Sequence, residues 1–214
     1  MCESTMNKLV AALLGGDSST SVVETERLRA DGVGTEEIIL QGVEVAMAEL
    51  DAKCTVEQFN LLEIMLSGRA VTEVMKVLCP VGSPAPTTKG TVVLATLEGD
   101  VHDLGKNILK MVLTGSGYRV VDCGKDCPVE NLIATAERER PLAVGISGLI
   151  TQVILQVRQV RPRLADVGLF SLPIFAGGAA LKQSSAESLC VDFVAESAFD
   201  GLHFVEQLAA SSDE

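Results

Sequence analysis

Aromatic residues and positive charge are scarce in this sequence. Phe, Trp and Tyr make up 3% of its 214 residues and Trp is absent, so nucleic-acid bases would find few side chains to stack on. Lys and Arg number 17 against 29 Asp and Glu, which gives a formal net charge of −12 at pH 7. Because binding to phosphates needs clustered Lys and Arg, we expect no nucleic-acid partner.

Long hydrophobic runs and CxxC cysteine pairs are also missing. No apolar run approaches the roughly 20 residues that a membrane-spanning helix needs, so we expect no membrane partner. The N-terminal "MCESTMNKLVAALLGGDSS" carries Glu3 and has one Lys before a short apolar stretch, which fits a signal peptide poorly. Cys123 and Cys127 are separated by three residues with no His nearby, which disfavours zinc. We expect reduced thiols in a cytoplasmic protein.

Residues 1–88 are predicted to form a helical domain. Apolar residues recur at helical spacing in four segments, so we expect a small bundle. Thr35 is the predicted N-cap of the third helix, and Pro80 ends the fourth. Residues 79–89 are rich in Pro, Gly, Ser and Thr, which indicates a linker. The four predicted helical segments are 4–16, 20–32, 34–53 and 55–78.

Residues 90–214 alternate between short apolar runs and helical segments. Five such alternations are typical of a parallel, doubly wound α/β sheet, for which we expect the strand order 2-1-3-4-5. The predicted strands are Thr91–Leu97, Tyr118–Asp122, Ala143–Ser147, Leu172–Ala176 and Val191–Val194. The predicted helices are Leu104–Gly115, Val129–Glu139, Leu149–Arg163, Ala180–Ser188 and Asp200–Ala209.

Polar and glycine-rich segments follow three of these strands. They are 98–105 after the first strand, 147–151 after the third, and 177–178 after the fourth. In open α/β sheets, ligands bind beyond the carboxyl ends of the strands, where the strand order reverses. We therefore expect a ligand site where the three segments meet.

Each of these polar residues also has an ordinary structural explanation. Asp103 would cap a helix, Asp100 would complete a tight turn, and Ser147 would cap the next helix. Residues 177–178 would form a plain turn. His203, in the last amphipathic segment, is expected to be solvated or satisfied locally.

The combination of Asp100 and His102 favours a metal. The two residues flank a single position, so in an extended loop both side chains project to the same side. A carboxylate bonded to one ring nitrogen leaves the other nitrogen free as a metal ligand. With one histidine available, the metal would arrive with its other ligands attached, as in a macrocyclic cofactor.

Three separated motifs resemble the cobalamin-binding module of corrinoid methyl-carrier proteins. "DVHDLG" fits the D-x-H-x-x-G motif, "SGL" fits S-x-L, and "GG" at 177–178 is the third element. Between Gly105 and Ser147 lie 41 residues, and between Leu149 and Gly177 lie 27, which also resembles the family. The resemblance covers residues 90–210. The helical half is similar to the cap domain of methionine synthase.

The resemblance implies a flavodoxin-like, Rossmann-like fold that binds cobalamin (methylcobalamin or cob(I)alamin) in the base-off, His-on mode. His102 would be the lower axial ligand of cobalt, Asp100 would bond its other nitrogen, and Ser147 would extend that network. The glycines would leave room for the nucleotide tail. The implied cofactor contacts are Asp100, Val101, His102, Asp103, Gly105, Ser147, Leu149, Thr151, Gly177 and Gly178, with Leu61 and Met65 from the helical cap.

The resemblance further implies a carrier subunit rather than a complete enzyme. It would accept a methyl group from a substrate-specific methyltransferase and pass it to a second methyltransferase, whose acceptor would be tetrahydrofolate or a thiol. A reductive activating protein is a third implied partner. Among the methyl donors of similar systems, we favour methoxylated aromatics in an O-demethylase system.

Three alternatives stay open. The cobalamin-binding subunit of an adenosylcobalamin-dependent mutase would resemble residues 90–210 but would generally lack the preceding helices. A cobalamin sensor usually carries a DNA-binding segment, and no basic recognition helix is visible. A flavodoxin-like domain without a corrinoid is the third.

Overall fold

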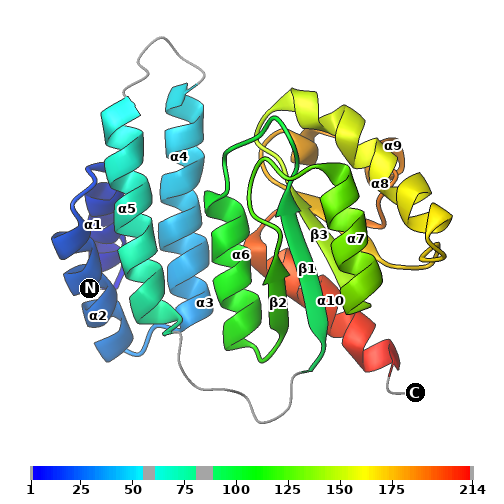
Figure 1. Cartoon of the computed structure of the whole chain (residues 1–214). Helices are drawn as coiled ribbons and strands as arrows, with labels where there is room; N and C mark the ends of the chain where they lie inside the picture. Colours follow the sequence, from blue (N-terminus) through cyan, green and yellow to red (C-terminus); the bar gives the residue numbers. More distant parts are fainter. Residues whose placement is uncertain (1, 55–60, 81–88, 213–214) are drawn as a thin grey trace. The chain divides into compact units, whose positions relative to one another are not determined.

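The computed structural model describes residues 2–54, 61–80 and 89–212 (Figure 1). The chain divides into two compact units, Met1–Gly82 and Ser83–Glu214. The division lies inside 79–89, the predicted linker, of which 81–88 fall outside the described residues. Within the described ranges, no helix is both long enough and apolar enough to cross a membrane.

The first unit is helical, as the periodicity predicts. Its core consists of buried apolar side chains from its helices, among them the fully buried Leu9, Leu13 and Leu28. The helix α2 starts after Asp17, whose carboxylate accepts a hydrogen bond from Thr20 N at 3.0 Å. The elements are α1 (Cys2–Leu14), α2 (Ser18–Ala30), α3 (Thr35–Ile38), the π-helical segment η1 (Ile39–Val43), α4 (Glu44–Cys54) and α5 (Leu61–Leu78).

The third predicted helix differs from the structure in two ways. Thr35 is the first helical residue, and Gly34 occupies the N-cap without a side-chain hydrogen bond, so the predicted cap is wrong. The helix is also interrupted by η1, which contains Gly42. A Cβ at Gly42 would lie 3.0 Å from Leu9 Cδ2 and 3.2 Å from Met6 Sδ, so α1 comes unusually close at this turn.

The second unit is a five-stranded, all-parallel sheet in the order β2-β1-β3-β4-β5. This confirms the predicted fold class and strand order. The strand ends move by up to two residues from the predicted ones. The strands are β1 (Thr91–Thr96), β2 (Arg119–Asp122), β3 (Ala143–Ser147), β4 (Ile174–Gly177) and β5 (Phe193–Ala195).

Helices cover both faces of this sheet (Figure 1). On one face, Val93, Ala95 and Leu97 join a core cluster with Leu132 of α7 (Val129–Glu139) and Val157 of α8 (Ile154–Asp166). The opposite face carries α6 (Leu104–Gly115) and α10 (Ala198–Ser212), which pack on each other.

Two predicted helices of this unit are shorter and preceded by 3₁₀ turns. The segment predicted as Leu149–Arg163 begins with the 3₁₀ turn η2 (Thr151–Val153) before α8. The segment predicted as Ala180–Ser188 is divided into η3 (Leu181–Gln183) and α9 (Ala186–Leu189).

The α6/α10 face of the sheet is packed closely at Gly145 of β3. A Cβ there would lie 2.5 Å from Phe175 Cζ and 2.6 Å from Leu94 Cδ2. Phe175 in turn lies 5.7 Å, centroid to centroid, from Phe204 of α10, and Phe204 stacks on Phe193 at 5.0 Å. Because Gly145 has no side chain, Phe175 and the two phenylalanine rings packed with it can come close to β1.

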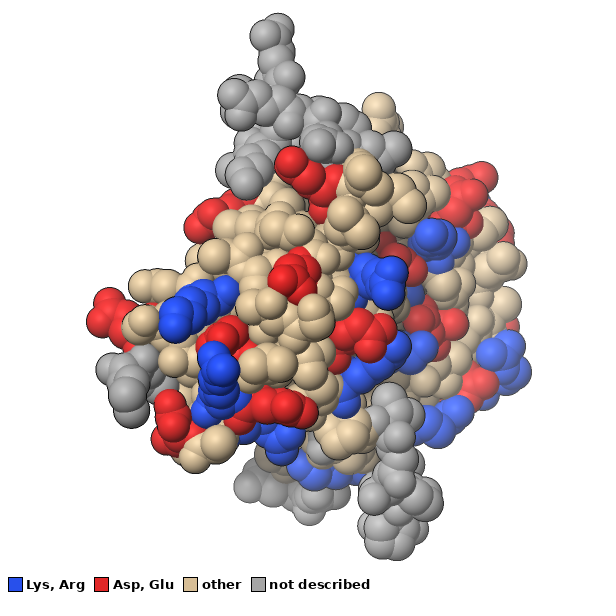
Figure 2. Space-filling view, turned by 90° about the vertical axis from the view of Figure 1, so that its left-hand side faces the viewer, with Lys and Arg blue, Asp and Glu red and all other residues tan. Residues whose placement is uncertain are grey.

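The excess of negative charge is not gathered in one patch on the face drawn in Figure 2. Lys and Arg side chains lie among Asp and Glu side chains there, with uncharged surface between them. On this face, therefore, neither sign of charge forms a continuous patch.

We predict that Gly145→Ala lowers the free energy of unfolding of the second unit by about 1–3 kcal/mol, because the added methyl group overpacks the core. Urea unfolding followed by Tyr118 fluorescence measures this. Tyr118 is buried in this unit and is the one tyrosine of a chain without tryptophan. Gly105→Ala is the matched control, since its Cβ would meet nothing within 4 Å. Equal stability of the two variants would contradict the prediction.

Candidate functional site

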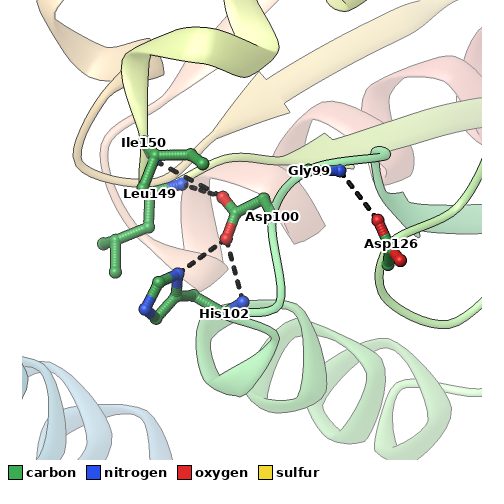
Figure 3. Close-up of polar contacts among 6 residues, drawn as sticks. All are labelled: Gly99, Asp100, His102, Asp126, Leu149 and Ile150. Atoms are coloured by element: carbon green, nitrogen blue, oxygen red, sulfur yellow. Dashed lines mark hydrogen bonds and ion pairs between the residues drawn. The ribbon is translucent and has the colours of Figure 1, made fainter.

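The Asp100 side chain is the centre of the site and is fully buried. Its Oδ1 accepts hydrogen bonds from His102 N at 2.9 Å and from the His102 ring Nδ1 at 2.7 Å. Its Oδ2 accepts from Leu149 N at 2.7 Å and, more distantly, from Ile150 N at 3.4 Å (Figure 3). The carboxylate therefore joins the segments that follow β1 and β3.

These donors keep Asp100 ionised. Burial acts to raise its pKa, but the N–H groups of Leu149 and His102 and the His102 ring outweigh burial and hold the pKa below its usual value. A carboxylate only accepts, so the Nδ1 that faces it carries the ring proton in the neutral imidazole. The other nitrogen, Nε2, keeps its lone pair and points away from Asp100 (Figure 3).

The His102 side chain is 52% exposed, in contrast to Asp100. Val101, which precedes it in the chain, and Leu149, whose N–H binds the same carboxylate, are exposed as well, although large apolar side chains usually are not. A solvent-facing ring nitrogen beside apolar side chains is suited to a ligand that combines a metal with an apolar body.

The segment after β1 is held by partners that the sequence analysis did not identify. Gly99 N donates to Asp126 Oδ1 at 2.8 Å, and Asp126 N donates to Asp100 O at 3.0 Å (Figure 3 shows the first contact). From α8, Gln156 Nε2 donates to Glu98 O at 2.7 Å. These partners lie far along the chain, so no local motif indicates them.

A buried ion pair holds α6, the helix that follows the site. Lys106 is 3% exposed and pairs with Asp122 at the end of β2, and Lys110 Nζ lies 3.1 Å from the same carboxylate. Burial acts to raise the pKa of Asp122, but Lys106, Gly124 N and Lys110 lower it below the usual range. In the sequence, this ion pair is indicated only by Lys106 and Lys110 lying one helical turn apart, so that both can reach the same carboxylate.

Ser147 lies at the end of β3 but does not take the predicted place in the network. Backbone N–H groups of Leu149 and Ile150, not the Ser147 hydroxyl, satisfy Asp100 Oδ2. A main-chain donor after β3 reaches the carboxylate whatever side chain is present. Ser147 also does not cap the next helix, since Ile150 occupies the cap position of η2.

Gly178 has a structural role that is independent of any ligand. Its φ is +101°, and a Cβ would lie 2.5 Å from Gly148 O. Gly177 differs, because its Cβ would meet Ala195 O at 3.4 Å, an ordinary contact. Gly105 would meet nothing within 4 Å. Of the three predicted glycines, only Gly178 is required by the chain's own packing.

The remaining predicted residues are placed as follows. Asp103 occupies the N-cap position of α6 without a side-chain hydrogen bond, and Thr151 is exposed at the start of η2. Met65, in the helical unit, is 64% exposed. Leu61 begins α5, but its side chain lies outside the described residues.

A row of small residues crosses the carboxyl end of the sheet on the α6/α10 face. The pairing register places Thr96, Ser147, Gly177 and Ala195 side by side. Thr96 is fully buried, and its Oγ1 has no hydrogen-bond partner. An unpaired buried hydroxyl is costly and calls for an explanation. No sequence motif points to Thr96, because it lies inside the strand.

Comparison with known protein families decides the identity. The family described as "B12 binding domain" matches residues 90–203, which contain Asp100, His102, the row of small residues and the glycines. The chain belongs to the B12-binding family. Cobalamin is therefore its cofactor, as the three motifs predict. In the described part of the chain, no group of three or more His, Cys, Asp or Glu could hold a metal ion by itself.

Corrinoid proteins are the relatives of this B12-binding chain. It is 30% identical over 209 residues to dimethylamine corrinoid protein 3 of Methanosarcina acetivorans, covering 96% of the chain and 97% of that protein. It is 32% identical over 152 residues to the methanol–corrinoid protein of Methanosarcina barkeri, covering 71% of the chain and 58% of that protein. These matches confirm the resemblance to corrinoid proteins.

Solved structures of corrinoid proteins are also similar to this chain. The monomethylamine corrinoid protein of Methanosarcina barkeri has a TM-score of 0.81 at 26% identity, over 96% of this chain and 99% of that chain. The methanol:cobalamin methyltransferase complex of the same organism has a TM-score of 0.56 at 27% identity, over 97% and 80%.

Asp100→Asn should lower the free energy of unfolding of the B12-binding unit by about 1–3 kcal/mol at pH 7, because the amide group would face N–H donors inside the protein. The lowered pKa of Asp100 means that its contribution is present above its unfolded pKa and is lost as pH falls through its folded pKa. The difference between wild type and variant should therefore begin to shrink below about pH 4, near the unfolded pKa, and disappear once the pH is below the folded pKa. Urea titrations across pH measure this.

Asp103→Asn is the control for this prediction. Asp103 lies in the same segment without a side-chain cap bond, so its change should stay within about 0.5 kcal/mol. A constant difference between wild type and Asp100→Asn at all pH values would contradict the stated role of the carboxylate.

Proposed function

We propose that this chain is the methyl carrier of a cobalamin-dependent methyltransferase system and binds its cofactor base-off, with His102 as the lower axial ligand of cobalt. The observation that carries the proposal is the pairing of a half-exposed imidazole with a buried carboxylate. Asp100 occupies Nδ1 and leaves the Nε2 lone pair directed outward. Imidazole is a suitable ligand for a transition metal, and its carboxylate partner fixes the ring.

The residues around the ligand have separate roles in this proposal. Asp100 keeps the proton on Nδ1 and fixes the ring, and its burial keeps water away from the carboxylate. A proton that enters or leaves the Asp100–His102 pair would change how strongly Nε2 donates electrons. Val101 and Leu149 would supply apolar contacts beside it. Bound cobalamin supplies a cobalt centre that takes up and releases a methyl group.

We assign the nucleotide tail to the row formed by Thr96, Ser147, Gly177 and Ala195. Small side chains in register allow a flat group to lie against the sheet. The Thr96 hydroxyl would obtain there the hydrogen-bond partner that it lacks. Gly105 and Thr151 remain proposed contacts of the tail. Gly177 supports the tail site because a Cβ there would fit the protein without a ligand, so the protein's own packing does not explain the glycine.

The partners follow from the carrier role. A substrate-specific methyltransferase would donate the methyl group, a second methyltransferase would accept it for tetrahydrofolate or a thiol, and a reductive activating protein would restore the cofactor. Relatives named for methanol and methylamines, matched across both units of this chain, support a carrier over a mutase subunit or a sensor. The methyl donor is set by the partner, so the methoxyaromatic O-demethylase system stays a prediction.

The axial ligand is tested by electron paramagnetic resonance of the cobalt(II) form. In protein labelled with nitrogen-15 histidine, the axial nitrogen coupling should change from the nitrogen-14 to the nitrogen-15 pattern. His102→Ala should abolish that coupling, because it removes the ligand. Far-ultraviolet circular dichroism of the variant should stay unchanged, since the His102 side chain is half exposed.

His203→Ala is the matched control, because His203 is the chain's other histidine and lies exposed on α10. It should keep the labelled coupling. Coupling from the benzimidazole of the cofactor, insensitive to the histidine label, would refute the proposed ligand exchange.

Thr96→Val should have opposite effects on stability and on binding. Without cofactor, removal of an unpaired buried hydroxyl should raise the free energy of unfolding by about 1 kcal/mol. With the hydrogen bond to the tail lost, the affinity for hydroxocobalamin should fall by about tenfold. Absorbance titration measures the binding, and Thr96→Ser, which keeps the hydroxyl, should bind as wild type does. Unchanged affinity of Thr96→Val would remove Thr96 from the site.

A further inference from the structure

Two cysteines flank the loop that connects β2 to α7, outside the proposed cofactor contacts. Cys123 directly follows Asp122, the last residue of β2, and Cys127 stands two residues before α7. Both are free thiols in the structure. Asp122 pairs with Leu94 of β1, and Cys127 forms a bridge with Leu97.

The strand register brings the two cysteines to the same face of the sheet. Because Asp122 lies opposite Leu94, Cys123 lies opposite Ala95, and Cys127 lies opposite Leu97. Positions two apart on a strand face the same side. Both cysteines accordingly contact the core cluster that contains Ala95 and Leu97.

Their backbone hydrogen bonds show that three loop residues lie between two nearby ladder positions, with Gly124 O accepting from Thr96 N at 3.0 Å. Cys123 N donates to Leu94 O at 2.8 Å and Cys127 N donates to Thr96 O at 3.0 Å. Residues 124–126 thus replace a single ladder position. Two strand steps separate the Cα atoms by about 6.6 Å, near the upper end of the roughly 4.4–6.8 Å that a disulfide spans.

The two thiols are close enough to influence each other's pKa. Burial is the largest effect and raises the pKa of both thiols, that of Cys127 to about 11, while the neighbouring thiol lowers the pKa of Cys123 and further raises that of Cys127. Cys127 is 3% exposed, whereas Cys123 is half-buried. A reagent from solution therefore reaches Cys123 first.

We propose that Cys123 and Cys127 are a modification site that forms a reversible disulfide by exchange with a low-molecular-weight disulfide. The Cys123 thiolate attacks one sulfur of the reagent and releases one thiol, which leaves Cys123 in a mixed disulfide. Cys127 loses its proton and attacks the Cys123 sulfur, and the second thiol leaves. The two protein thiols lose two electrons together, and one small disulfide is reduced to two thiols.

The loop enclosed by this bond supports the segment after β1. Asp126 accepts from Gly99 N and donates its own N–H to Asp100 O. A disulfide would close the loop at both ends and restrict residues 124–126. The inference rests on the thiol geometry and holds whether or not His102 ligates cobalt.

The test uses the full-length protein in glutathione buffers from fully reduced to fully oxidised, with quenching by alkylation. Trypsin cleaves after Arg119, Lys125 and Arg138, so the two cysteines fall on separate peptides, 120–125 and 126–138. A non-reducing digest should contain these peptides joined, and a thiol reductant should separate them. At the oxidising end, the joined pair should hold most of Cys123.

Matched variants make the assignment specific. Cys190→Ser, at an exposed cysteine, should leave the joined pair unchanged. Cys123→Ser and Cys127→Ser should each abolish it, and the half-buried Cys123 gives the variant that disturbs the core less. The proposal is overturned if Cys123 stays alkylatable in oxidised glutathione, ends as a glutathione adduct only, or joins another cysteine.

Discussion

The buried carboxylate of Asp100 is the interaction on which the site depends. It brings a negative charge out of water, which is unfavourable unless donors replace the lost hydration. Here the donors are His102 N, His102 Nδ1 and the N–H groups of Leu149 and Ile150. Because these donors follow two different strands, the charge is stable only when β1 and β3 are adjacent and in register. The orientation of the imidazole is therefore set by the sheet as a whole.

The strand order 2-1-3-4-5 makes this adjacency possible. The turn after β4 contributes through Gly178, which lies so close to Gly148 O that a side chain would not fit. Gly148 N also donates to Gly177 O at 3.0 Å. The close backbone contact holds the residue immediately before Leu149, whose N–H binds Asp100. Glycine at 178 thus supports the histidine indirectly, through main-chain packing.

Periodicity predicted the architecture because strands and helices bury regular faces, and that regularity is visible in sequence. The short segment also predicted the contact between Asp100 and His102, since the two residues flank a single position. Individual hydrogen bonds were less predictable. The motifs implied that Ser147 extends the Asp100–His102 network, whereas the donors to Asp100 Oδ2 are the main-chain N–H groups of Leu149 and Ile150. A backbone N–H has no residue identity, so a sequence motif contains no sign of it. Asp126 was missed because its partner Gly99 is 27 positions away.

The polar groups of the site differ in burial and in hydrogen bonding. These differences distinguish the residues that support the site from those that can act on a ligand. Asp100 is buried and satisfied by several donors, so changing its protonation means breaking contacts on two strands. His102 is half exposed, and its outer nitrogen has no such constraint (Figure 3). Thr96 is buried and unpaired, which costs stability in the absence of a ligand. In this site the buried carboxylate has its hydrogen-bond partners, whereas the outer nitrogen of His102 and the hydroxyl of Thr96 do not. Such an arrangement is suited to binding a ligand rather than to stability alone.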